Sequence, residues 1–203
     1  MTKGSSHKPV MDWTQSQLTV SPGLMRVRQV AREGKSGQFT ALLHHVTPEL
    51  LKASYRALKR KAAPGMDGVT WESYGENLEA NTSALHARLH NGSYRAQPAR
   101  RVHIDKADGT KRPLSILCLE DKIAQHAVSQ ALHAIYEEEF VGFSYGFRPG
   151  RGQHQALDAL YTGLLFRKVN WVLDLDIQRF FDAVDHDWML RMLAHRIADR
   201  RIL

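Results

Sequence analysis

The sequence predicts an α+β fold, and three observations support that prediction. Apolar residues recur at the spacing of amphipathic helices over most of the chain, most clearly between Leu119 and Phe140. Two extended segments joined by a turn between Ala99 and Ile116 indicate a β-hairpin. A later extended segment, Trp171–Ile177, alternates apolar and acidic residues as a strand does. Several helices with one hairpin and one separate strand are typical of an α+β protein.

The composition indicates a folded protein with a polyanionic partner. The chain has 203 residues, of which 43% are hydrophobic, and this suffices for a buried core. Its 28 Lys and Arg against 21 Asp and Glu give a net charge of +7, which favours nucleic acid ahead of a membrane surface. No apolar run reaches the about 18 residues of a membrane span, so we expect a cytoplasmic protein without a membrane partner. The single cysteine, Cys118, excludes an intrachain disulfide and is predicted to be a core residue.

The first 38 residues are predicted to form a mobile leader and one helix. Residues 1–20 are rich in Ser, Thr, Gln and Lys and lack sustained periodicity. The segment that follows has apolar residues at helical spacing and ends at a glycine-containing break. The apolar positions are Leu24, Val27, Val30 and Ala31, and the break is residues 34–37.

A second helix is predicted to begin at Thr47, an N-cap residue type that is followed by Pro48 and an acid. It continues to Leu58 and has a basic side with no acid between the charges. The basic residues are Lys52, Arg56, Lys59, Arg60 and Lys61. A phosphate-facing surface and a surface that serves solubility explain them equally well.

A turn-rich loop and a third helix follow. Pro64-Gly65 and Asp67-Gly68 supply positions at which the backbone can reverse. Apolar and small polar residues then recur at helical spacing until Asn91-Gly92, which is typical of a helix end. The residues on this helix face are Leu78, Asn81, Leu85 and Leu89.

The predicted hairpin between Ala99 and Ile116 is crowded with basic residues. Six Lys and Arg between Tyr94 and Arg112 face only two Asp. A hairpin with a Lys near its turn and an Arg on its return strand can close over a triphosphate, because Lys is a point charge and Arg a planar fork. The alternative is an edge hairpin that uses its charges to prevent aggregation.

The clearest helix, Leu119–Phe140, is predicted to be a core helix and is followed by a loop of aromatic residues and glycines. This loop, residues 141–152, carries Arg148 and Arg151. Aromatic rings can stack on bases, and guanidinium groups can bind phosphate where glycine lets the backbone approach. Structural aromatic residues in a buried loop are the competing interpretation. A further helix is predicted over residues 153–166.

The Trp171–Ile177 strand is predicted to place Asp174 and Asp176 on one face and apolar residues on the other. A turn with Phe180 and Phe181 follows. A strand that ends in carboxylates can hold a divalent metal ion, although acidic strand ends are also common as solvated surface. From Trp188 onward, helical spacing resumes and is predicted to run to the end of the chain.

Five motifs in this order resemble the reverse transcriptase domain of group II intron-encoded proteins, also called maturases. The resemblance runs from about Phe39 to Leu203. It implies a reverse transcriptase fingers-palm (right-hand polymerase) fold, truncated within the palm: the leader and N-terminal helix at 1–38, fingers at 39–150, and the start of the palm at 151–203. The motifs are Lys61-Ala62-Ala63-Pro64-Gly65-Met66-Asp67-Gly68-Val69-Thr70, Lys111-Arg112-Pro113-Leu114, residues 119–125, residues 143–151, and Asp176-Ile177-Gln178-Arg179-Phe180-Phe181-Asp182 with Asp185-His186.

The resemblance implies a metal site and a nucleotide site. Asp176 matches the first metal-binding and catalytic aspartate of the palm, and the carbonyl of Ile177 would be a further ligand to Mg²⁺. Phe181 matches the residue that excludes a 2′-hydroxyl. The amides of Arg179 and Phe180 would face the triphosphate, and Lys106 and Arg112 would clamp it. The implied contacts to RNA are Lys59, Arg60, Lys61, Arg148 and Arg151.

The resemblance also shows departures. Asp105 stands where the family usually has proline beside the clamp lysine, and Ser115-Ile116-Leu117 stands where it usually has Gly-Ile-Pro. Two-metal chemistry needs further carboxylates, which the family supplies from a downstream Tyr-x-Asp-Asp turn, and these 203 residues contain no Asp-Asp pair. We therefore expect an N-terminal fragment with only part of the two-metal site, inactive by itself.

The implied function is RNA-directed DNA synthesis of the group II intron type, in intron mobility and splicing. Its partners would be intron RNA, an RNA template with a DNA primer, and deoxynucleoside triphosphates; the sequence leaves the oligomeric state open. The first alternative is an RNA-binding maturase that assists splicing without polymerase activity. The second is a reverse transcriptase associated with a retron or a defence system.

Overall fold

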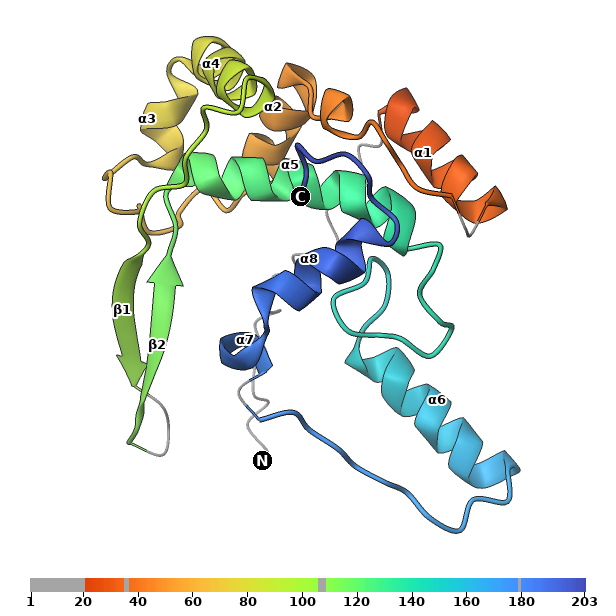
Figure 1. The fold of residues 1–203 in the computed structure, drawn as a ribbon. Coiled ribbons are helices and arrows are strands. Elements are labelled where there is room, and N and C mark those ends of the chain that lie inside the picture. The colour runs from red at the N-terminus through yellow and green to blue at the C-terminus, as the bar shows by residue number, and fades with distance from the viewer. Residues whose placement is uncertain (1–20, 35–36, 106–108, 179) are drawn as a thin grey trace, which may run out of the picture. The chain divides into compact units, whose positions relative to one another are not determined.

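The structure is a computed structural model that describes residues 21–34, 37–105, 109–178 and 180–203 (Figure 1). These residues form two compact units. The core unit contains the described residues up to Glu138 together with Asp185–Leu203, and the second unit contains Glu139–Val184. The elements are α1 (Pro22–Glu33), the 3₁₀ helix η1 (Leu43–His45), α2 (Pro48–Ala57), α3 (Trp71–Gly75), α4 (Leu78–His90), β1 (Arg100–Asp105), β2 (Lys111–Ile116), α5 (Leu119–Tyr136), α6 (Gln153–Phe166), α7 (Phe180–Ala183) and α8 (His186–Ala194).

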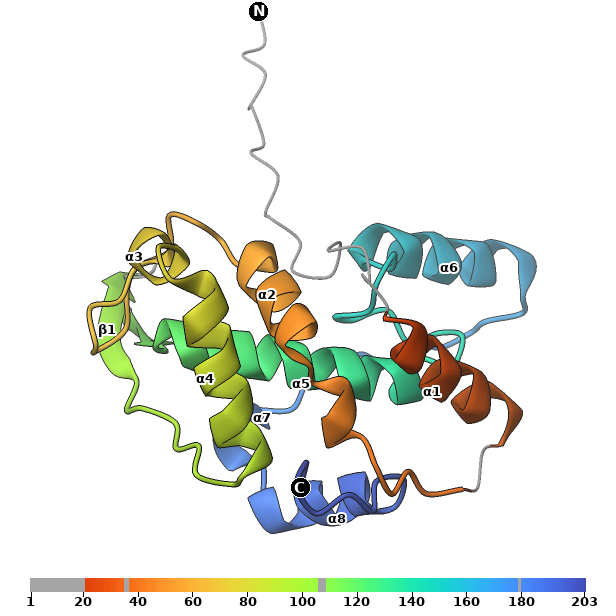
Figure 2. The ribbon, with the colours of Figure 1, turned by 90° about the horizontal axis from the view of Figure 1, so that it is seen from above.

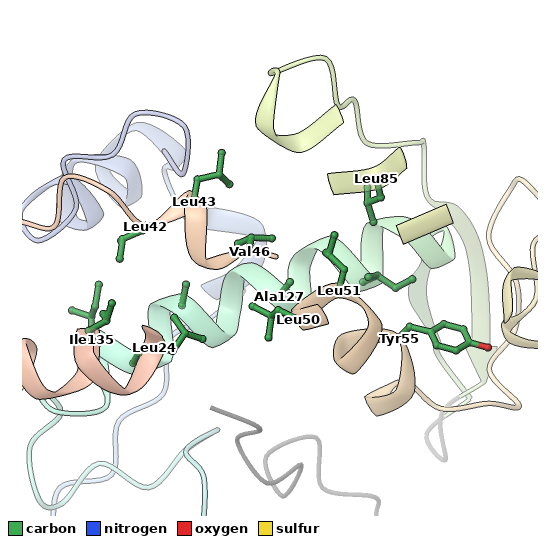
Figure 3. Close-up of a cluster of buried hydrophobic side chains, with 14 of the residues drawn as sticks. Leu24, Leu42, Leu43, Val46, Leu50, Leu51, Tyr55, Leu85, Ala127 and Ile135 are labelled. Atoms are coloured by element: carbon green, nitrogen blue, oxygen red, sulfur yellow. The ribbon is translucent and has the colours of Figure 1, made fainter. Parts of the chain in front are cut away.

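Helix α5 is the centre of the core unit, and α1 and α2 pack against it (Figure 2). Four of its residues are fully buried, at the four-residue spacing that keeps side chains on one helix face: Ile123, Ala127, Ala131 and Ile135. Figure 3 shows Leu24 of α1 beside Ile135, and Leu51 of α2 beside Ala127. The predicted core helix is therefore confirmed, and Cys118, which precedes it, is buried as predicted.

The predicted starts of the first two helices are confirmed by their capping bonds. The Ser21 hydroxyl accepts a hydrogen bond from the amide of Leu24 at 3.3 Å, and the Thr47 hydroxyl accepts one from Leu50 at 3.2 Å. The expectation that Val30 joins the apolar face of α1 is wrong, because Val30 is 55% exposed. Six residues after Leu24, it lies about 120° away from Leu24 around the helix.

The hairpin is confirmed as an antiparallel pair of strands that extends away from the helices (Figure 1). The register pairs Ile104 with Arg112 and Asp105 with Lys111. Because directly paired residues share a face, Arg112 lies on the face that carries Ile104, and Lys111 lies on the opposite face with Asp105. The acid that departs from the family pattern therefore stands directly across from a lysine.

The base of the hairpin is fixed to α5 by buried polar contacts. The Asp121 carboxylate accepts hydrogen bonds from the Tyr94 hydroxyl and, at 3.2 Å, from the amide of Gln97. Burial and the bond to Asp121 raise the pKa of the Tyr94 hydroxyl well above its usual range, so Tyr94 remains a donor. The Arg100 guanidinium donates to the carbonyl of Pro64 at 3.0 Å, which joins the hairpin to the turn-rich loop.

The predicted strand at Trp171–Ile177 is wrong. These residues form an extended segment without strand pairing, and Trp171 and Leu175 are 92% and 81% exposed. Among the described residues, the sheet consists of β1 and β2 only. Alternation predicts which residues share a face, but a strand also needs a neighbour for its backbone N–H and C=O groups.

The expectation that the last helix runs to the end of the chain is also wrong, because α8 ends at Ala194. The next residues pair with the segment that precedes η1. Phe39 donates to the carbonyl of Arg196 at 2.9 Å and accepts from the amide of Ala198 at 2.8 Å, and Ile197 is fully buried. Tertiary pairing has thus replaced helical bonds that the sequence pattern alone would favour.

The structure adds short helices that were not predicted, namely α3, α7 and the 3₁₀ helix η1. Helix α3 begins with a capping box between Thr70 and Ser73. None of the described helices is both long and apolar enough to cross a lipid bilayer.

Candidate nucleotide and nucleic-acid site

The acidic segment and α7 form an open hollow of about 610 Å³ in the second unit. Four predicted site residues line it, namely Asp176, Ile177, Phe180 and Phe181. The rings of Phe180 and Phe181 meet edge to face, with centroids 5.4 Å apart. A small ligand in this hollow would meet a carboxylate and an aromatic ring at the same time.

The hollow also contains residues that sequence reasoning missed. Leu175 and Asp182 line it, and Asp182 lies in the first turn of α7. The spacing of six residues between Asp176 and Asp182 was visible in the sequence, but the short helix that brings Asp182 to the hollow was not predicted. The predicted triphosphate contact Arg179 lies outside the described residues.

The donor atoms in the hollow are of the type that Mg²⁺ prefers. Asp176 offers carboxylate oxygens, and Ile177 offers a backbone carbonyl. In the part of the chain that the structure describes, no three His, Cys, Asp or Glu side chains lie close enough together to hold a metal ion. The chemistry of Asp176 fits one ligand position of a magnesium site, and its role as a ligand stays a prediction.

Of the two predicted clamp residues, the structure describes one. Arg112 is exposed on β2, in the core unit, whereas Asp176 belongs to the second unit. Lys106 lies outside the described residues.

Three of the basic residues that were predicted to form a surface on the second helix are exposed but lie in a turn after α2 and not on the helix itself. Helix α2 ends at Ala57, so Lys59, Arg60 and Lys61 lie in the turn that follows it. The guanidinium of Arg60 stands 4.8 Å from the ring of Trp71. The Lys52 ammonium lies 3.0 Å from the Glu79 carboxylate, so the basic side is not free of acids as the sequence order suggested.

The two arginines of the glycine-rich loop turn toward the loop itself. Arg148 is 5% exposed and donates to the carbonyls of Val141 and Ser144 at 3.1 and 3.0 Å. Arg151 donates to the carbonyls of Gly142 and, at 3.4 Å, Ser144. Their predicted contacts with RNA stay predictions, but both guanidinium groups already bind backbone.

Residues 104–202 match the family model described as reverse transcriptase (RNA-dependent DNA polymerase). This stretch includes the hairpin from Ile104, α5, the glycine-rich loop and the hollow around Asp176. It belongs to the reverse transcriptase family. The five motifs predicted this membership, and the match confirms it.

Relatives of this reverse transcriptase segment extend the likeness to most of the chain. It is 37% identical to protein YkfC of Escherichia coli K12 over 80% of its own length and 44% of the relative. It is 30% identical to the group II intron-encoded protein LtrA of Lactococcus lactis, over 88% of its length and 30% of the relative. It is 27% identical to the nuclear intron maturase 1 of Arabidopsis thaliana over 41% of its length and 12% of the relative. The chain thus spans less than half of the length of these relatives.

Proposed function

We propose that this chain supplies the nucleotide-binding fingers and the first metal-binding segment of a group II intron reverse transcriptase. The observation that carries the proposal is the reverse transcriptase match, which covers the hairpin from Ile104 onward and the Asp176 hollow in one continuous stretch. The likeness to a group II intron-encoded protein over 88% of the chain supports the intron type. Its partners are then intron RNA, a primer and template, and deoxynucleoside triphosphates.

Each proposed role follows from the chemistry of one side chain. Asp176 holds a hard cation with its carboxylate, and the carbonyl of Ile177 adds a second oxygen. An Mg²⁺ ion held by these oxygens would supply the Lewis acid that activates a primer hydroxyl and stabilises charge on the leaving pyrophosphate. The exposed ring of Phe181 stands beside the hollow, where it blocks a 2′-hydroxyl. Arg112 binds the triphosphate from the hairpin with its planar fork.

The experiment that tests this proposal separates catalysis from binding. A fusion protein joins this chain to the part of the Lactococcus relative that follows the matched region, and Asp176→Asn is introduced into it. The carboxamide keeps the shape of the side chain but removes an anionic oxygen, so primer extension should fall by about two orders of magnitude or more. Binding of the RNA template should not change.

The matched control is Asp158→Asn, an exposed aspartate on α6. It should leave extension unchanged. Near-normal extension by the Asp176→Asn fusion would refute the assigned metal ligand. The 203-residue chain alone should bind RNA but should not extend a primer, because a single metal-binding aspartate does not position two ions.

A second function, assistance in splicing without polymerisation, is favoured by one observation. The matched relatives include a protein named as an intron maturase. The two functions differ in their need for Asp176. If splicing of the host intron survives Asp176→Asn while DNA synthesis is lost, both functions are present and use different surfaces; if DNA synthesis is absent from the wild-type fusion, only the maturase function remains.

A further inference from the structure

The glycine-rich loop, residues 141–152, is held together by its two arginines. Three backbone carbonyls of the loop, those of Val141, Gly142 and Ser144, accept hydrogen bonds from these guanidinium groups. Arg148 also stands 4.9 Å from the ring of Phe140. Charged donors that bind several carbonyls of one short segment hold that segment in a single curled conformation. The loop backbone is therefore ordered by its own arginines.

The same curled backbone turns two rings outward. Phe143 is 79% exposed and Phe147 is 85% exposed. Exposing an apolar ring to water is unfavourable in free energy. Phe147 has a φ of 55°, in the left-handed region that residues other than glycine rarely adopt. Keeping a bulky residue in this conformation costs stability, and such positions are concentrated at functional sites.

We propose that this loop is a stacking platform for the unpaired bases of single-stranded RNA, with Phe143 and Phe147 as its contact rings and Arg148 and Arg151 as positioning residues. The proposal rests on the proposed function, which provides the RNA partner. Flat exposed rings bind bases of any sequence by stacking. No acid occurs between residues 140 and 152, so the positive charges of the buried Arg148 and the partly buried Arg151 attract the phosphate backbone without touching it.

This arrangement keeps the stacking role that the sequence suggested for the rings but changes the role of the arginines. There, the arginines were expected to bind phosphate. In the structure, Arg148 is buried and bound to carbonyls, whereas the rings are free to touch a ligand. The platform therefore contributes affinity that depends on bases rather than on phosphate charge, and this difference can be measured.

The test compares Phe143→Ala and Phe147→Ala with the wild-type chain on three probes. The probes are a 12-nucleotide single-stranded RNA, the same sequence as a duplex, and inorganic polyphosphate, which has no bases. Each substitution should weaken single-strand binding roughly tenfold. Binding of polyphosphate and of the duplex, whose bases are already stacked, should be unchanged. Phe143→Trp should retain single-strand binding, because the larger ring still stacks.

Phe166→Ala is the matched control, because Phe166 is a 78% exposed aromatic residue of the same unit that lies on α6. It should leave all three affinities unchanged. Equal losses on polyphosphate and RNA would overturn the stacking proposal, as would wild-type binding by both loop variants. A loss of self-association in the loop variants, measured by sedimentation, together with unchanged RNA binding would assign the rings to a protein contact instead. Failure of the wild-type chain to bind RNA would overturn the RNA partner as well.

The left-handed conformation of Phe147 gives an independent test. Phe147→Gly should raise the thermal midpoint of the chain, since glycine adopts this conformation without strain, and should weaken single-strand binding. A ring that only packs in the fold would give the opposite result, a lower midpoint with unchanged binding.

The positioning role of Arg148 is tested by Arg148→Lys, which keeps the charge but loses the planar fork. Single-strand binding should fall while the slope of log affinity against log salt stays the same. If Arg148 instead bound phosphate directly, Lys would preserve much of the binding, and Arg148→Gln would reduce the slope by about 0.7. That second result would overturn the positioning role.

Discussion

The carboxylate of Asp199 accepts a hydrogen bond from the backbone amide of Leu42 at 2.8 Å, across 157 positions of sequence. The same oxygen accepts from the amide of Leu43 at 3.0 Å, and the Arg201 guanidinium donates to both carboxylate oxygens at 2.9 Å. The residues after α8 are thereby fixed to the start of η1. This contact joins the C-terminal segment of the core unit to a segment near its N-terminus.

Asp199→Asn should destabilise the core unit by about 2 kcal/mol, since it replaces a charged acceptor of several hydrogen bonds in a buried position. The measurement is the midpoint of urea denaturation followed by circular dichroism. The control is Glu76→Gln, which changes the same chemical group at an exposed position and should shift the midpoint little. Equal midpoints for wild type and Asp199→Asn would refute the structural role of the carboxylate.

The same contact should make stability depend on pH. The bonds from Arg201 and the amides of Leu43 and Leu42 hold the pKa of Asp199 well below its usual range. A lowered pKa in the folded state means that the stabilisation is present above the unfolded value of about 3.9 and is lost as pH falls toward the folded value. Wild type should therefore lose more stability than Asp199→Asn when denaturation is repeated at pH 5 and at pH 3.

Gly65 should not tolerate alanine. A Cβ at this position would stand 2.5 Å from the Cα of Cys118, so the turn-rich loop or the start of α5 would have to move. We expect Gly65→Ala to cost about 2 kcal/mol. Gly163→Ala is the control, because a Cβ there meets open space in the last turn of α6 and alanine favours a helix. Thermal midpoints that move the same way for both variants would contradict the close contact.

Phe181→Ala should relax sugar selection in the fusion with the Lactococcus relative. Removing a ring that borders the hollow opens space for a 2′-hydroxyl, so incorporation of ribonucleotides relative to deoxyribonucleotides should rise about tenfold or more. The ratio is measured by single-nucleotide extension with each triphosphate. Phe166→Ala should leave the ratio unchanged, because Phe166 is an exposed ring of the same unit that lies on α6 and does not line the hollow. An unchanged ratio in Phe181→Ala would make this ring a structural residue.

The helices and the hairpin could be predicted from sequence because their signals are local. Thr47 and Pro48 mark the start of α2. The buried face of α5 is marked by apolar residues at four-residue spacing, Ile123, Ala127, Ala131 and Ile135. The two strands of the hairpin were indicated by two extended runs on either side of a segment that is rich in turn-forming residues. Each of these features is determined by residues that are neighbours in the sequence.

The wrong predictions for the acidic segment and for the end of α8 concern partners that are distant in the sequence. Asp199 bonds to Leu42, and no local pattern indicates that α8 must end before it. The alternation of apolar and acidic residues at Trp171–Ile177 is typical of a strand, but it does not show whether a second strand lies beside the segment to pair with its backbone. In the candidate site, the roles of Asp176 and Phe181 were predicted from the resemblance. The inward orientation of Arg148 could not be predicted, because it depends on the directions of backbone carbonyls that are set only in the folded loop.

The last prediction tests the basic turn after α2, where Lys59, Arg60 and Lys61 are exposed. Each Lys or Arg that binds phosphate releases counterions, which contributes about 0.7 to the slope of log affinity against log salt for a single strand. Replacing all three by Gln should therefore lower the slope by about 2 while leaving the stacking contribution of the glycine-rich loop intact. The control with the same charge change replaces exposed arginines elsewhere in the core unit, Arg26, Arg32 and Arg200. If both triple variants lower the slope equally, RNA responds to net charge alone, and the turn is not a phosphate-binding surface.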